Sequence, residues 1–515
     1  LHRVRRSVGS CGMIRRLHRL VDPFTPAEGP PPDRLWPFTR WALSGAERAI
    51  LLACLVTFLT GASELVAARF TGWVIDYAGE MGPGGFWGPF WPLILGGALF
   101  FLLLRPLLFV FDAGVSGIML GPNLFPMVLQ RLNRHTLGQS MTFFENDFAG
   151  RISQKALQTS RALTDLVLET TDVVIYSLAM FLGAFLLIGG IDPWLLGVFA
   201  IWAVLYAGAL WFFIPRVQAR SKARAGARTL VTGQIVDAYS NIATVKLFAR
   251  DDSEDRAVLD SLDVYRTRSL DFGELSAWFR MTLMALGGML PFVSILGALY
   301  LWSAGSASAG DIAMTAMVTT RLSMLTNRLG RVAIAIFTNI GEMEDGIATL
   351  ARAHTIRDRD GAQEMGRAKG RIGFHDVGFS YGGESHALNG FDLRVAAGEK
   401  VALVGTSGAG KSTAMSLLLR LHDVERGRIT LDDMDLRDLT QSTLRRQIAV
   451  VRQDTNMFNR SAMDNIRYGR PDATDEEVFA AARRAAAHDF ILCLKDFKGR
   501  EGYEARLGER GVKLS

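Results

Sequence analysis

Long apolar runs, separated by basic and polar connections, fill about the first two thirds of the chain. Each run contains about 20 mainly apolar residues, the length that crosses the hydrocarbon core of a bilayer as an α-helix. Five runs show this pattern clearly, and a sixth, which carries Arg321, Arg328 and Arg331, is less apolar. We include the sixth because an odd number of spans would place the two chain ends on opposite sides of the membrane. The predicted spans are residues 50–68, 90–111, 167–188, 194–214, 281–302 and 312–340.

The basic residues between the spans predict the orientation. Arginine and lysine gather in the N-terminal segment and in the two long connections, whereas only Arg69 lies between the first two spans. The short connections 189–193 and 303–310 contain no basic residue. Basic loops tend to stay in the cytoplasm. We therefore predict an integral protein of the inner or plasma membrane whose N-terminus, long connections and C-terminal region are cytoplasmic.

The two long connections, of roughly 50 and 65 residues, are expected to be helical. Their polar–apolar rhythm is typical of helices, which would continue beyond the bilayer. Each connection includes a mostly apolar stretch, 141–148 in the first and 239–248 in the second. Two interpretations of these stretches remain open: local core packing, or a docking surface for a cytoplasmic domain.

The composition agrees with a membrane protein. Of the 515 residues 49% are hydrophobic and 21% are charged, and the mean hydropathy is +0.19, whereas soluble proteins average about 25% charged residues. Disordered, collagen-like and disulfide-scaffold classes are therefore excluded. The net charge of +6 comes from basic residues that flank apolar spans. This placement argues against a nucleic-acid partner.

The cysteines and the N-terminus add little. Cys11, Cys54 and Cys493 are far apart and form no CxxC pair, so we predict neither a disulfide framework nor a zinc site. Residues 1–20 are basic but lack the apolar core of a signal peptide. The first span is then expected to be the uncleaved insertion signal. Because the chain begins with Leu1 and not Met, we expect an alternative start or a trimmed chain.

After residues 346–370 the charges become denser and the apolar runs shorter. Residues 371–381 and 388–395 alternate between apolar and polar positions, as strands do. The run KVALV at 400–404 predicts a short buried strand, and 414–421 predicts a helix.

Between that predicted strand and helix lies GTSGAGKST, which matches the P-loop pattern G-x-x-x-x-G-K-[ST] in its usual context. Glycines let the backbone N–H groups wrap around phosphate oxygens, and the following helix contributes its dipole. Lys411 would reach the β- and γ-phosphates, and the Ser412 hydroxyl would ligate Mg²⁺. The predicted cofactors are ATP and Mg²⁺. The candidate nucleotide-binding residues of this loop are Gly405, Thr406, Ser407, Gly408, Ala409, Gly410, Lys411, Ser412 and Thr413.

Two further motifs lie near the P-loop. Tyr381 stands about 30 residues before Lys411, and Gln453 lies within VVRQDTNMFNRSAMDNIRYG. With six spans and long connections, they resemble the ABC transporter superfamily, specifically a half-transporter of the type I exporter class, over about residues 48–515. The resemblance implies that Tyr381 stacks on adenine. It also implies that Gln453 contacts Mg²⁺ and the attacking water and that Lys411 acts in catalysis.

The C-terminal end departs from the family. GERG at 508–511 matches the loop before the family signature, where Glu509 is expected near the membrane domain, but the signature stops after Leu514 and Ser515. The family's Walker B aspartate, catalytic glutamate and switch histidine would all follow it. We therefore expect a C-terminally truncated chain that, as printed, binds nucleotide without hydrolysing it, whereas the complete protein is expected to be an ATP hydrolase coupled to transport. Its nucleotide domain is expected to lack core strands, which leaves an exposed sheet edge.

The fold class expected is an α-helical transmembrane bundle with long intracellular extensions, followed by an incomplete α/β P-loop nucleotide-binding domain. The predicted domains are a basic cytoplasmic segment, a six-helix membrane domain, a linker and an ATP-binding domain. Their boundaries are 1–47, 48–345, 346–370 and 371–515.

The resemblance implies ATP-driven export of a small hydrophobic, amphiphilic or lipid-like substrate, by a dimer of half-transporters surrounded by membrane lipid. A homodimer is favoured over a heterodimer. The alternative is a non-hydrolysing, nucleotide-binding regulatory subunit or an inactive fragment. Charged residues inside spans usually face a cavity or a partner, and Glu64, Arg105, Asp112 and Arg321 qualify. For Arg321 two roles remain open, contact with an anionic substrate or pairing with an acidic residue.

Overall fold

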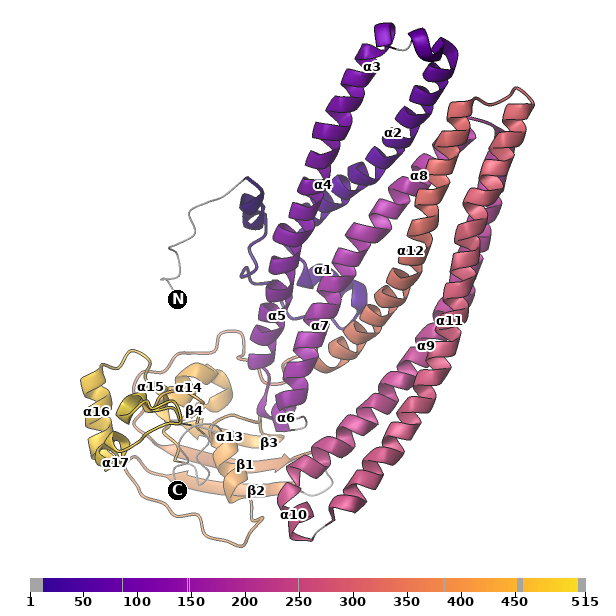
Figure 1. Cartoon of the computed structure of the whole chain (residues 1–515). Coiled ribbons are helices and arrows are strands. Elements are labelled where there is room, and N and C mark those ends of the chain that lie inside the picture. The colour runs from indigo at the N-terminus through magenta and orange to yellow at the C-terminus, as the bar shows by residue number, and fades with distance from the viewer. Residues whose placement is uncertain are drawn as a thin grey trace. The chain divides into compact units, whose positions relative to one another are not determined.

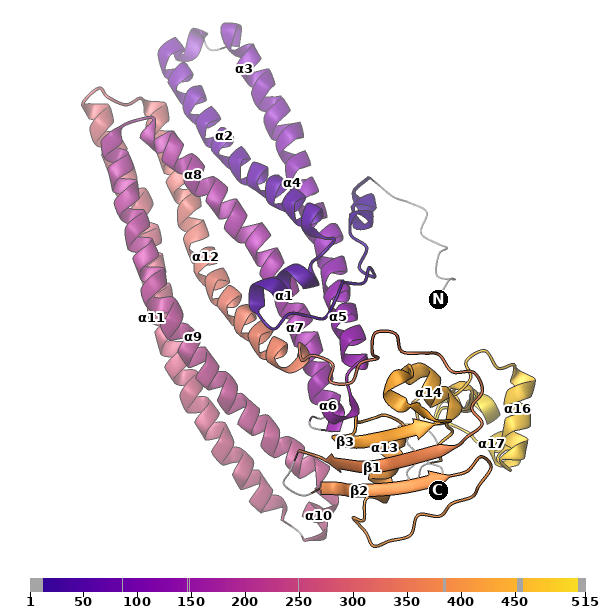
Figure 2. The ribbon, with the colours of Figure 1, turned by 180° about the vertical axis from the view of Figure 1, so that it is seen from behind.

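The computed structural model describes residues 13–85, 87–145, 147, 149–248, 250–382, 386–451 and 457–507. The chain divides into two compact units, Leu1–Arg357 and Asp358–Ser515. The division falls inside the segment predicted as a linker. The first unit is helical and the second contains the sheet (Figures 1 and 2).

Helices of very different length build the first unit (Figure 1). They are α1 (Leu35–Ala42), α2 (Glu47–Gly85), α3 (Trp87–Leu99), α4 (Arg105–Gly114), α5 (Gly121–Leu137), α6 (Met141–Glu145), α7 (Ala149–Glu169), α8 (Tyr176–Gly189), α9 (Pro193–Ser240), α10 (Ile242–Leu247), α11 (Asp251–Ser303) and α12 (Ala309–Leu350). Of these, α2, α9, α11 and α12 have 39 to 53 residues each. Three π-helical turns, Phe100–Leu104, Val115–Leu120 and Thr170–Ile175, join α3 to α4, α4 to α5 and α7 to α8.

Among the described residues, five helical segments are long and apolar enough to cross a membrane. They are Glu47–Gly82, Trp91–Leu137, Ala149–Gly189, Pro193–Ser240 and Asp252–Ser303. The five clearly apolar runs therefore lie in helices as predicted. The sixth predicted span lies in α12, a helix of 42 residues whose composition is too polar to be counted with the other five.

The helices extend well beyond a bilayer, as expected for the long connections. α9 has 48 residues, about 70 Å at 1.5 Å per residue, against about 30 Å of hydrocarbon. The two apolar stretches contain the short helices α6 and α10. Phe143 of α6 is buried in a core cluster, which supports core packing there. Leu247 of α10 and the adjacent Phe248 are exposed, 80% and 67%.

Aromatic stacking and hydrogen bonds hold α9 in the bundle. The ring of Phe181 on α8 stacks on Trp202 of α9 at 6.0 Å, and Trp202 stacks in turn on Tyr206 of the same helix at 5.5 Å. Trp202 Nε1 donates to Leu286 O of α11 at 2.7 Å, and Tyr206 Oη donates to Thr326 O of α12 at 3.0 Å. Both side chains are buried, so each polar end has a partner where water is excluded.

The charge of Arg321 is paired with an acidic side chain, the second of its two predicted roles. Glu64 of α2 is 4% exposed, and its Oε1 accepts a hydrogen bond of 2.6 Å from Arg105 Nη2 of α4. Its Oε2 lies 3.7 Å from Arg321 Nε of α12. One buried carboxylate therefore joins three helices and offsets two arginines. Asp112 is also satisfied, because it accepts from Thr57 Oγ1 at 2.6 Å.

α2 and α12 approach each other backbone to backbone at a pair of glycines. A Cβ on Gly72 would lie 2.9 Å from Gly310 O, and a Cβ on Gly310 would collide with Gly72 O and the Asp76 carboxylate. Asp76 Oδ1 accepts from Gly310 N at 2.6 Å, and Oδ2 accepts from Ser308 Oγ at 2.8 Å. An α2 carboxylate thus covers the N-terminus of α12, where a negative charge is favourable.

The second unit contains a four-stranded antiparallel sheet in the order β2-β1-β3-β4. Its strands are β1 (Ile372–Ser380), β2 (His386–Val395), β3 (Arg426–Leu431) and β4 (Met434–Asp435). Its helices are α13 (Lys411–Leu418), α14 (Gln441–Gln447), α15 (Ala462–Arg467), α16 (Asp475–Arg484) and α17 (His488–Leu492). One core lies between the sheet, α13 and α14, and a second is formed by α15, α16, α17 and the chain after them. The first two predicted strands are confirmed as β1 and β2.

The prediction of a buried strand at 400–404 is wrong. The segment forms no ladder, and Val404 is 92% exposed. A buried parallel strand needs neighbours on both sides, and among the described residues no segment pairs with this one. Residues 448–451 are similar, an apolar run outside any strand in which Val451 is 99% exposed.

Gly310→Val tests the glycine contact between α2 and α12. We expect the free energy of unfolding to fall by about 1–3 kcal/mol or more, because the added side chain must push two helix backbones apart. Gly288→Val on α11 is the control, since nothing lies within 4 Å of a Cβ there. The measurement is thermal unfolding in detergent. Equal losses in the two variants would contradict the close approach.

Glu64→Gln tests the shared carboxylate. We expect a loss of about 2 kcal/mol, less than the roughly 3–5 kcal/mol of a fully buried pair, because the Arg321 side chain is 46% exposed. Glu80→Gln, at an exposed position of the same helix, controls for the loss of charge. Adding Arg105→Gln to Glu64→Gln should recover part of the loss. Without that recovery, unfolding would not depend on charge pairing.

Candidate functional site

The P-loop runs into the first turn of α13, and two of its glycines adopt conformations that other residues avoid. Gly408 and Gly410 both have φ of 83°, in the left-handed region that favours glycine. A Cβ on Gly410 would also lie 2.7 Å from Ala387 O of β2. A Thr406 O to Ala409 N hydrogen bond of 3.2 Å closes the loop. The local sequence therefore dictates a tight turn that leads into the helix N-terminus.

Lys411 is folded over the loop. Its Nζ donates to Gly405 O at 2.8 Å and to Thr406 O at 2.7 Å. The ammonium group thus lies against the same loop whose N–H groups would face an anion, and it adds a positive charge to the N-terminus of α13. The arrangement is suited to bind a polyanion such as a chain of phosphates.

The two hydroxyl residues after Lys411 differ in exposure. Ser412 is exposed, and no described residue hydrogen-bonds its hydroxyl. Thr413 is 7% exposed, and its Oγ1 accepts from Tyr381 Oη at 3.4 Å. Ser412 is therefore the hydroxyl available to a ligand or metal ion. No cluster of three or more His, Cys, Asp or Glu side chains able to hold a metal occurs among the described residues.

An aromatic group stands beside the loop. Tyr381 follows β1 and is 55% exposed. Its ring makes edge contacts with Phe379 at 4.9 Å and with His422 at 5.3 Å, which hold it in place and leave ring surface open to a flat ligand. Sequence reasoning missed His422, because a single histidine after a helix carries no recognisable pattern.

Gln453 lies outside the described residues, as do Glu509, Leu514 and Ser515. Residues 458–465 are held together by Asn465, whose amide makes hydrogen bonds from both its oxygen and its nitrogen. Its Oδ1 accepts from Phe458 N at 2.9 Å, and its Nδ2 donates to Phe458 O and Ser461 O at 3.0 Å. The Phe458 and Asn465 pair in the motif therefore has a structural role.

The membrane unit has an apolar cavity of about 650 Å³ between α2, α3 and α8. Aromatic and aliphatic side chains line it, and Arg69 is the one ionisable group among the lining residues. Arg69 Nη1 pairs with Asp311 Oδ1 at 3.3 Å. Sequence reasoning had singled out the charged residues of the spans and missed this cavity, whose residues are ordinary for membrane helices. Two lining residues, Phe70 and Trp73, lie in the sequence between the first two predicted spans.

Two family models match the chain. The model of the ABC transporter transmembrane region matches residues 49–325, and the ABC transporter model matches residues 388–509. An uncharacterized ABC transporter ATP-binding protein of Haemophilus influenzae is 37% identical over 495 residues, which are 96% of this chain and 80% of that protein. The beta-(1→2)glucan export ATP-binding/permease protein NdvA of Nitrobacter winogradskyi is 38% identical over 281 residues, 54% of this chain and 45% of that protein.

A solved structure, that of a bacterial Atm1-family ABC exporter with ATP bound, has the same fold. The TM-score is 0.78 at 23% identity, and the match covers 91% of this chain and 81% of that chain. With the spans and the matched regions, it supports an integral membrane protein with a cytoplasmic ATP-binding domain. The chain belongs to the ABC transporter family, with the architecture of an exporter half-transporter.

Proposed function

We propose that this protein is a subunit of a dimeric exporter that couples ATP hydrolysis to transport across the inner or plasma membrane. The observation that carries the proposal is the complete P-loop, with Lys411 folded over it, in a chain that also supplies long membrane-spanning helices. One bundle and one ATP site are half of an exporter, so a second copy of this chain is the favoured partner.

The geometry of the loop supports the following roles for its residues. The N–H groups of 405–413 wrap the phosphates, and Lys411 leaves its two carbonyl partners to contact the β- and γ-phosphates. Tyr381 stacks on the adenine ring. Mg²⁺ bound with the nucleotide would neutralise phosphate charge. The exposed Ser412 hydroxyl fits its ligand set, because Mg²⁺ is usually held by few protein oxygens together with phosphates and water. Gln453 is proposed as a second ligand, on the family resemblance.

The proposed substrate is small and hydrophobic, amphiphilic or lipid-like. The apolar cavity of about 650 Å³ supports an apolar body, since ligand pockets usually measure about 300–1,000 Å³ and are mainly apolar. Arg69, which is paired with Asp311, is the one ionisable group in its lining and is suited to contact a polar end.

Lys411→Ala tests the proposed function. We expect loss of ATP binding and of ATP-dependent uptake into inverted membrane vesicles that contain the full-length protein, because the ammonium contact with the phosphates disappears. Lys400→Ala removes a nearby exposed lysine outside the loop and should leave both activities within about twofold of wild type. If Lys411→Ala still bound ATP normally, the site would not be a nucleotide site.

Tyr381→Ala tests the adenine contact. We expect nucleotide binding to weaken by about 5- to 150-fold, which corresponds to about 1–3 kcal/mol of stacking. Tyr381→Phe keeps the ring and loses only the long hydrogen bond to Thr413, so its affinity should stay near wild type. Titration with a fluorescent ATP analogue measures both. Similar affinities for the alanine and phenylalanine variants would exclude stacking.

A further inference from the structure

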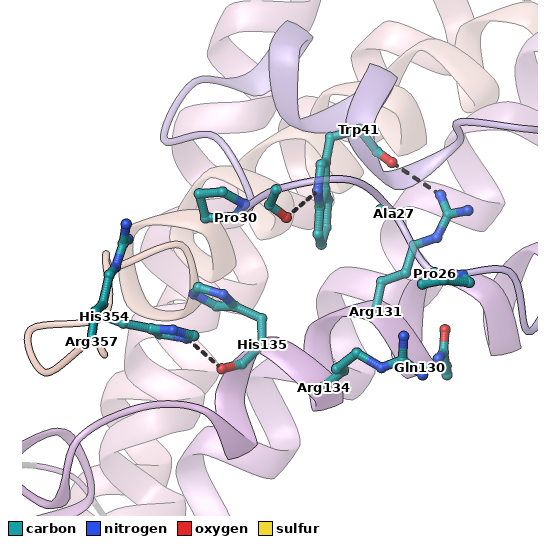
Figure 3. Close-up of a pocket in the computed structure, with 11 residues that line it drawn as sticks. Pro26, Ala27, Pro30, Trp41, Gln130, Arg131, Arg134, His135, His354 and Arg357 are labelled. Atoms are coloured by element: carbon teal, nitrogen blue, oxygen red, sulfur yellow. Dashed lines mark hydrogen bonds between the residues drawn. The ribbon is translucent and has the colours of Figure 1, made fainter. Parts of the chain in front are cut away.

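A second pocket, lined by basic and polar side chains, lies in the first unit (Figure 3). It has a volume of about 240 Å³ and is enclosed by the N-terminal segment, the end of α5 and the chain that follows α12. Its lining contains three arginines and two histidines, and no Asp or Glu. The lining residues are Pro26, Ala27, Gly29, Pro30, Trp41, Gln130, Arg131, Arg134, His135, His354 and Arg357.

Arg131 brings a buried positive charge to this pocket. The residue is 3% exposed, and its guanidinium donates to Thr25 O, Ala42 O and Ser44 O at 2.8–3.2 Å. These acceptors satisfy its N–H groups but do not cancel its charge. Among the described residues no carboxylate lies within ion-pair distance of Arg131, and Glu47 acts on its charge only from farther away. A buried charge is costly unless an opposite charge approaches it.

Arg134 and Gln130 extend the polar surface. They lie four residues apart on α5 and hence on the same face of the helix; Figure 3 shows their side chains near each other. Arg134 is exposed, with no ion-pair partner among the described residues. Gln130 Oε1 is buried without a hydrogen bond in the same part of the structure. Both groups are available to a ligand.

The side of the pocket formed by His135 and His354 is held in place by contacts between α5 and the chain after α12. The rings of His135 and His354 stack at 4.4 Å, and His354 Nε2 is 2.9 Å from His135 O. Arg352 O accepts a 2.6 Å hydrogen bond from Gln139 Nε2. Gly138 permits the close approach of the His354 ring, because a Cβ at Gly138 would lie 2.8 Å from His354 Cε1. The segment that carries His354 and Arg357 is thus fastened to the end of α5.

The N-terminal wall belongs to a membrane-surface segment. Trp41 Nε1 donates to Gly29 O at 3.1 Å and holds the proline-rich loop in place. In the same segment Phe24 is 68% and Trp36 is 81% exposed, and the first span follows within a few residues. Exposed aromatic side chains next to a span are typical of the membrane–water interface.

We propose that this pocket binds a phosphate group, supplied by an anionic lipid headgroup or by a soluble phosphate compound. Arginine forks match the geometry of phosphate oxygens, and a positive lining with no carboxylate selects an anion. The volume is below that of most drug-sized sites, so the pocket takes a headgroup-sized moiety. Arg134 makes the direct contact, while Arg131 supplies the fixed charge behind it.

The lipid arm of the test uses the purified full-length protein. Native mass spectrometry compares the retention of phosphatidylglycerol with that of phosphatidylcholine of the same acyl chains. Wild type should retain the anionic lipid preferentially, and Arg134→Glu should weaken that retention by about tenfold, as expected for one charge-assisted contact. Arg40→Glu is the control for the change of charge, because Arg40 is an exposed arginine of α1 that does not line the pocket. It should change retention less than about twofold.

The soluble arm measures thermal unfolding with millimolar sodium phosphate or glycerol 3-phosphate against chloride at equal ionic strength. Protection of wild type but not of Arg134→Glu, without preferential lipid retention, supports the pocket with a soluble compound as its ligand. Equal effects of Arg134→Glu and Arg40→Glu in both arms would reduce the result to general charge attraction and overturn the proposal. Absence of any anion preference in wild type would overturn it as well.

Discussion

Neutralisation of charge on α12 by α2 is the constraint on which the membrane unit depends. α12 carries Arg321, Arg328 and Arg331 through a region that lies among apolar helices. Glu64 offsets Arg321 and Arg105 together, and Asp76 covers the N-terminus of α12. With these partners in place, α12 packs against α2, α7 and α11. The Glu64 carboxylate therefore allows the charge of Arg321 to be kept in the bundle, with the Arg321 side chain half exposed.

The sequence predicted the membrane helices well, because a run of about 20 apolar residues is a local property. Its limits appear where the structure depends on distant residues. Nothing near Arg321 in the chain identifies Glu64 as its partner, 257 positions away, yet pairing decides how the charge is tolerated. Residues 400–404 show a different limit, a strand that the sequence predicts and the structure does not form. Their pattern is that of a buried strand, but a strand forms only when neighbours pair with it, and Val404 lies exposed.

The candidate ATP site also combines features that a local motif predicts with features that depend on distant residues. The P-loop was readable from the sequence because its glycines, Lys411 and Ser412 act at fixed spacing, and the positive φ of Gly408 and Gly410 gives the physical reason for that spacing. Tyr381 was expected from the family resemblance, and the structure places it beside Thr413. His422, which supports the Tyr381 ring, has no local signature. Its contribution exists only after β1 and the end of α13 have come together.

The histidine stack between α5 and the chain after α12 has a mechanical consequence. Residues 351–357 lead directly to Asp358, where the second unit begins. This tether has two attachments, the covalent one at the end of α12 and the stack of His354 on His135. A displacement of Asp358 therefore exerts force on α5 and α12 together. The force is then shared by α5, which continues the second span, and by α12. It does not act on α12 alone.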